Sequence, residues 1–147
     1  MKKLLLYTLL FWINTVYSQE LPPLRAMLES KGLNDVSTYA YFGTRCATLF
    51  SSSAYYLKNN GLPSDASTVN ALMYKSDTFR NIALRLDITQ KKSSENIEFQ
   101  NRYFFETYSN LINRNKQVFN NAFEGQILSD MSVCNQIFSA YEKNASK

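Results

Sequence analysis

The chain has 147 residues, a net charge of +4 and no histidine. This length suits a single domain and is too short for a barrel enzyme or a two-domain dinucleotide-binding enzyme. The lack of histidine removes the side chain most used for acid–base catalysis near neutral pH, which is also the commonest metal ligand. With only 4 glycines and 3 prolines, the composition also argues against a turn-rich β-sandwich or β-barrel.

The first residues follow the pattern of a secretory signal peptide. Lys2 and Lys3 precede an apolar run over residues 4–16, and Val16 and Ser18 are small residues at the positions expected before a cleavage site. We predict cleavage after Ser18, which makes residues 1–18 a signal peptide and residues 19–147 a single helical domain. The run is shorter than the roughly 20 apolar residues of a membrane span. An uncleaved membrane anchor and a helix of the fold are the alternatives for this segment.

The charge of the mature chain gives little reason to expect an anionic partner. Without Lys2 and Lys3 the net charge falls from +4 to +2. Binding to nucleic acid needs a dense basic stripe, and the sequence has none, so we expect no nucleic-acid partner. We expect contact with a membrane only during export, unless the signal segment stays uncleaved.

Two cysteines, Cys46 and Cys134, remain in the mature chain. In an oxidising compartment outside the cytoplasm such a pair usually forms a disulfide, which we predict here. Two buried free thiols or a redox role are the alternatives, but the CxxC motif of thioredoxin-like proteins is absent.

Apolar residues recur at spacings of three and four along almost the whole mature chain, which is the period of an α-helix. Start signals are Asn34 or Asp35, Asp65, Ser93 or Ser94, and Ser129 with Asp130. Gly32 and Gly61 are stop signals. The pattern predicts five helices, over residues 23–31, 35–59, 65–89, 95–123 and 129–143.

The short connections between the long helices make them antiparallel neighbours. We therefore predict an all-α fold: an up-and-down four-helix bundle with a short extra N-terminal helix, clamped by the Cys46–Cys134 disulfide. One face of the second helix is lined by small residues, which would let another helix approach closely; these are Ala40, Gly43, Ala47 and Ala54.

Motifs for catalysis or cofactor binding are missing from the sequence. It has no glycine-rich phosphate loop and no S-x-x-K nucleophile pattern. Most carboxylates fall at predicted helix caps or on exposed faces. We therefore predict no catalytic residue, no metal site and no cofactor. An enzyme that acts on cell-wall material through a pair of carboxylates is an alternative.

The mature chain is rich in aromatic residues, with 17 Phe and Tyr. Consecutive residues on a helix point about 100° apart, so neighbouring aromatics cannot all face one core. We expect some of them to form an interaction surface beside Arg45. The alternative is tyrosines at the rim of the core and an arginine that reaches into solvent. The candidate surface comprises Tyr41, Phe42, Arg45, Tyr56, Phe99 and Tyr103.

These observations favour an exported, non-catalytic, small helical binding protein in the periplasm or secreted from the cell. Its expected partner is another protein or a small apolar ligand. The alternative from another class is a structural envelope protein that an uncleaved first segment holds at the inner membrane.

Overall fold

The computed structural model describes residues 21–61 and 65–145. The predicted signal peptide, residues 1–18, lies outside them. The described residues contain helices and no strand, so the all-α fold with a short leading helix is confirmed. The five helices are α1 (Leu24–Lys31), α2 (Val36–Asn60), α3 (Ala66–Thr89), α4 (Ser94–Phe119) and α5 (Gln126–Ala145).

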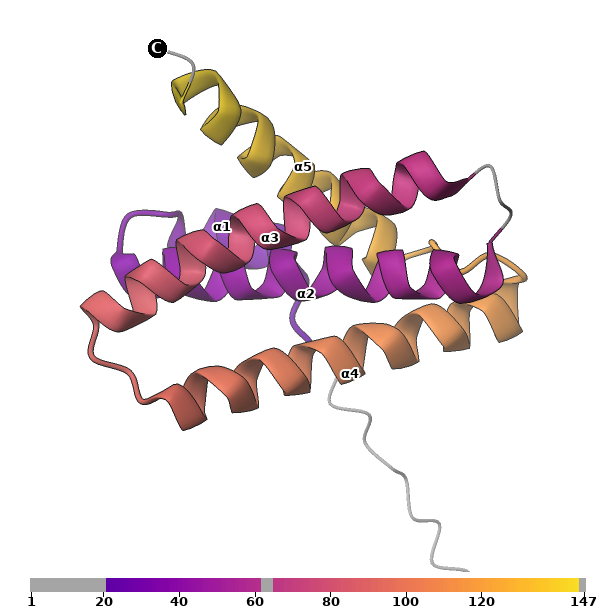
Figure 1. The fold of residues 1–147 in the computed structure, drawn as a ribbon, viewed down its shortest axis with the longest axis horizontal. Helices are drawn as coiled ribbons and strands as arrows, with labels where there is room; N and C mark the ends of the chain where they lie inside the picture. Colours follow the sequence, from indigo (N-terminus) through magenta and orange to yellow (C-terminus); the bar gives the residue numbers. More distant parts are fainter. Residues whose placement is uncertain (1–20, 62–64, 146–147) are drawn as a thin grey trace, which may run out of the picture.

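Helix α2 is the central element of the bundle, because α3, α4 and α5 all pack against it. Successive long helices run in opposite directions, and α3 and α4 lie on either side of α2 (Figure 1). α3 and α4 hardly touch each other. α5 crosses the other long helices obliquely, and α1 packs against α5.

The interface between α2 and α3 is close because its residues are small. A Cβ atom added to Gly43 would lie only 3.0 Å from the Cβ atom of Ala83. The Ser76 hydroxyl donates a hydrogen bond of 2.8 Å to the backbone carbonyl of Ala47. The small face expected on the second helix therefore receives α3.

Two of the predicted helix starts are confirmed by side-chain caps. Asp35 accepts a hydrogen bond of 2.8 Å from the Thr38 backbone amide at the start of α2. Hydrogen bonds from the Thr38 hydroxyl and from this amide lower the pKa of the Asp35 carboxyl. Ser93 accepts a bond of 3.3 Å from the Asn96 amide at the start of α4.

Helix α4 ends at Phe119, four residues before its predicted end. Asn120 follows in the left-handed region at φ 53° and stops the helix. The buried Asn115 side chain then donates to the backbone carbonyls of Ala122, at 3.4 Å, and Glu124, at 2.9 Å. These bonds satisfy loop carbonyls that a continued helix would have paired internally.

Helix α5 begins at Gln126, three residues earlier than predicted. Gly125 precedes it at φ 55°, a conformation that glycine adopts without strain. Ser129 and Asp130 therefore lie inside α5, and the prediction that they cap it is wrong.

The Cys46–Cys134 disulfide joins α2 to α5 across the core, with an S–S distance of 2.03 Å and a Cα–Cα distance of 5.5 Å. The predicted clamp is thus present in the structure. The largest apolar side chains buried around it come from α1, α2, α4 and α5; they are Leu24, Phe42, Leu49, Phe50, Tyr108, Ile112, Ile127 and Val133.

Replacing Cys46 by Ser is expected to lower the free energy of unfolding by about 4 kcal/mol. The bridge closes a loop of 88 residues, and opening it restores the entropy of the unfolded chain. Denaturant unfolding with and without reductant measures the effect. The Cys46→Ser/Cys134→Ser double variant is the control, since reductant must leave it unchanged. Equal stability of the wild type with and without reductant would contradict the prediction.

Replacing Gly43 by Val is expected to destabilise the fold by about 1–3 kcal/mol, because the added side chain meets Ala83 at the closest approach of α2 and α3. The control is Ala71→Val, at an exposed position of α3. It should lower the free energy of unfolding by no more than about 0.7 kcal/mol, because valine has a lower helix propensity than alanine. Denaturant unfolding of both variants makes the comparison. A Gly43→Val protein as stable as Ala71→Val would show that the interface is looser than described.

Candidate functional site

A buried ion pair lies at the centre of the molecule. Arg45 of α2 and Asp130 of α5 are in contact through Nη2 and Oδ2 at 2.8 Å, and neither side chain is exposed. Tyr108 of α4 accepts a hydrogen bond of 2.8 Å from Arg45 Nε and donates one of 2.8 Å to Asp130 Oδ2. The pair therefore connects three helices through charged hydrogen bonds, which are stronger than neutral ones.

The same cluster binds the segment that leads into α1. Arg45 Nη1 donates to the Pro22 carbonyl at 3.0 Å, and the Leu24 amide donates to Asp130 Oδ1 at 2.8 Å. Nearby, the Gln126 side chain donates to the Leu21 carbonyl at 2.7 Å. Both carboxylate oxygens of Asp130 are thus engaged. The cluster serves to hold the fold together, because it presents no open group to a substrate.

Burial and the neighbouring side chains together set the protonation states of Arg45 and Tyr108. Removal of the phenol from water raises the pKa of Tyr108 well above its ordinary value. Burial opposes the charge of the Arg45 guanidinium, but Tyr108, Tyr41 and Asp130 outweigh this and raise the pKa of Arg45. Arg45 therefore stays charged and Tyr108 stays neutral throughout the physiological range.

Two residues of the candidate interaction surface are buried in the core. Phe42 is 1% exposed and Arg45 is fully buried, so the prediction that they lie on an exposed surface is wrong. The alternative of a solvent-reaching Arg45 is also wrong. Arg45 can be buried because the carboxylate of Asp130, 85 residues away in the sequence, forms an ion pair with its guanidinium. Tyr41 and Phe104 flank the guanidinium with ring centroids at 5.7 Å.

The other four predicted residues do not form one surface with them. Tyr41 is half-buried, and Tyr56 packs against Phe123 with a ring distance of 5.9 Å. Phe99 is 65% exposed and stacks on the half-buried Tyr103 of the next helical turn at 6.5 Å. A role of this exposed pair in an interaction stays a prediction.

The structure contains a cleft that the sequence reading missed. It has a volume of about 760 Å³ and lies between the second half of α2 and the first half of α3, with one side chain from α4. This volume falls in the range of small-molecule sites. Two charged residues, Lys58 and Asp65, line it, and its apolar lining comprises Ala54, Tyr55, Leu57, Ala66, Val69, Met73 and Phe105.

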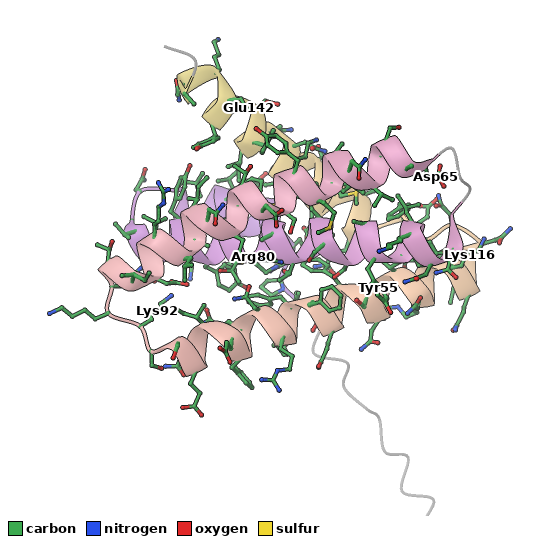
Figure 2. All side chains as sticks on the ribbon, viewed as in Figure 1. Tyr55, Asp65, Arg80, Lys92, Lys116 and Glu142 are labelled. Atoms are coloured by element: carbon green, nitrogen blue, oxygen red, sulfur yellow. A yellow bond between two sulfur atoms is a disulfide. The ribbon has the colours of Figure 1, made fainter. Side chains whose placement is uncertain are left out.

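A second hollow of about 500 Å³ adjoins the cleft and shares the lining residues Ser51 and Phe105 with it. Arg80 of α3 and Arg102 of α4 line this end, together with Glu98. We call the two parts together the α3–α4 groove. In Figure 2, Tyr55 marks the apolar part and Arg80 the charged part.

Two small hydroxyl residues of α2, Thr48 and Ser51, line the second hollow, and Ser51 also lines the apolar cleft. The Thr48 hydroxyl donates to the Thr44 carbonyl at 2.9 Å, and the Ser51 hydroxyl donates to the Thr48 carbonyl at 3.1 Å. Because these donors bond within their own helix, the two residues present no unpaired hydroxyl proton to a ligand. Thr48 and Ser51 are visible in the sequence, but only the positions of α3 and α4 make them part of a groove.

Among residues 21–61 and 65–145, no three acidic or cysteine side chains gather closely enough to hold a metal ion. Within the same residues, no helix is long and apolar enough to cross a membrane. Comparisons of the chain with protein-family models, curated proteins and solved structures find no match.

Replacing Tyr108 by Phe is expected to lower the free energy of unfolding by about 1–3 kcal/mol, since Arg45 Nε loses its acceptor inside the core. The wild type should also lose stability as the pH rises above about 10, the pKa of an unfolded tyrosine. Burial makes the pKa of Tyr108 higher in the folded chain than in the unfolded chain. Below about pH 10 the phenol is neutral in both states, and its contribution to stability is fully present. Above this pH the unfolded chain loses the proton first, which lowers the free energy of unfolding.

Urea unfolding between about pH 9 and pH 11 measures both effects. The alkaline loss of stability should be smaller in Tyr108→Phe than in the wild type. Tyr141→Phe is the matched control, because it removes a hydroxyl from a ring that is 41% exposed. If the free energy of unfolding falls equally between about pH 9 and pH 11 in the wild type and in Tyr108→Phe, the assignment of this loss to Tyr108 is refuted.

Proposed function

We propose that this protein is an exported, non-catalytic binding protein that holds an apolar ligand, or an apolar segment of a partner, in the α3–α4 groove. The observation that carries the proposal is the cleft of about 760 Å³ with apolar side chains from three helices. Met73 is 39% exposed and Tyr55 is 61% exposed at this cleft. When a ligand removes the apolar side chains of an open cleft from water, the free energy of binding becomes more favourable.

The proposed location, periplasmic or secreted, has two supports. One is the leader pattern of residues 1–18, with its two lysines and apolar run. The other is the Cys46–Cys134 bridge, because disulfides persist in oxidising compartments.

The scaffold around the groove suits binding because its main elements are held in place before a ligand arrives. α2 forms the floor and is tied to α5 by the disulfide and by the Arg45–Asp130 pair. α3 is fitted closely onto α2 at Gly43. A preformed site loses less conformational entropy on binding.

Met73→Lys is expected to weaken binding of Nile red, a neutral apolar dye, by about tenfold or more, which corresponds to about 1.4 kcal/mol. The charge replaces an apolar wall of the cleft. Fluorescence titration of the purified mature protein gives the dissociation constants. The control is Val118→Lys, which changes a 65% exposed apolar residue outside the groove lining. If the two variants bind the dye equally well, the groove is not the site.

A further inference from the structure

We propose that the natural ligand of the α3–α4 groove is a long-chain fatty acid, with its acyl chain in the apolar cleft and its carboxylate between Arg80 and Arg102. This inference rests on the proposed function and names the class of its ligand. It follows from the difference between the two ends of the groove.

The length of the groove suits an extended acyl chain. On α3 the lining runs from Ala66 in the apolar cleft to Arg80 in the second hollow. These residues are separated by about 20 Å along a helix that rises 1.5 Å per residue. Ser51 and Phe105 line both parts, so a single chain that passes them can contact both ends.

The charges at the far end favour an anion. Two guanidinium groups and one carboxylate, that of Glu98, line the second hollow. Arg80 is held only loosely by Asp77, at 3.7 Å, and both side chains are more than half exposed. Such a pair contributes little, so its guanidinium can turn to a ligand. The planar guanidinium forms two parallel hydrogen bonds with a carboxylate.

A fatty acid explains the groove better than an apolar helix of a partner protein does. A helix laid over the whole groove would cover Arg80 and Arg102 without supplying an anion, and covering a charge without a partner costs free energy. A fatty acid carries one anionic group at one end, which suits a groove with two arginines and one carboxylate in the second hollow and the opposite charges of Lys58 and Asp65 in the apolar cleft.

The test is displacement of Nile red from the mature protein by two amphiphiles with chains of equal length, each below its micelle concentration. Laurate carries an anionic head, and dodecyltrimethylammonium carries a cationic one. We expect laurate to displace the dye at a concentration at least tenfold lower. Arg80→Gln/Arg102→Gln should abolish this preference when each amphiphile's displacement is compared at the variant's own measured affinity for Nile red. Arg85→Gln, which removes an exposed arginine of α3 outside the groove, should retain it.

The outcomes separate the two proposals. Equal displacement by both amphiphiles would overturn the fatty-acid assignment, because the head group would not be recognised. Failure of both to displace a dye that Met73→Lys weakens would also overturn it, while the binding groove itself would stand. Dye binding that is indifferent to Met73→Lys would overturn both. A preference for laurate that survives the double arginine variant would place the carboxylate elsewhere and refute the assignment.

Discussion

The ion pair between Arg45 and Asp130 is the interaction on which the rest of the structure depends. Arg45 is next to Cys46 on α2, and Asp130 lies one turn before Cys134 on α5, so the disulfide holds the two charges at bonding distance. A buried charge without its partner would destabilise the fold by about 3–5 kcal/mol. The pair therefore requires α5 to cross α2 at this point. Tyr108 adds α4, and the backbone around Leu24 adds the segment before α1.

The open groove is a consequence of how this cluster occupies α2. α5 and the segment before α1 are bound on the side of α2 that carries Arg45 and Cys46. α3 covers the side that carries Gly43 and Ala47. α4 packs on α2 but hardly touches α3, which leaves a strip of α2 between them. Short side chains of that strip, among them Thr48, Ser51 and Ala54, do not fill the space, and the groove results.

The candidate site was harder to predict than the fold, and particular residues show why. Asp130 follows a serine at the start of an apolar periodic segment, which is the usual signature of a helix cap. In the folded chain it pairs with Arg45, which is 85 residues away in the sequence. A local sequence pattern gives no information about which distant residue will lie beside it. The aromatic neighbours of Phe42 in the sequence favour an outward position for it, whereas the folded chain buries it. Phe105 and Met73 come from different helices and only meet in the folded chain.

The sequence by itself determined the helices and most of their ends, because these depend on local information, and it determined the disulfide because the chain has only two cysteines. Helix hydrogen bonds join residues four apart, caps act within one turn, and two cysteines allow one intramolecular pairing. The tertiary structure alone decided that a charged residue is buried, that α2 is the central helix, and that a groove opens between α3 and α4. These features depend on the free energy of burying groups that come together from distant parts of the chain, where a charge is stable only beside its partner.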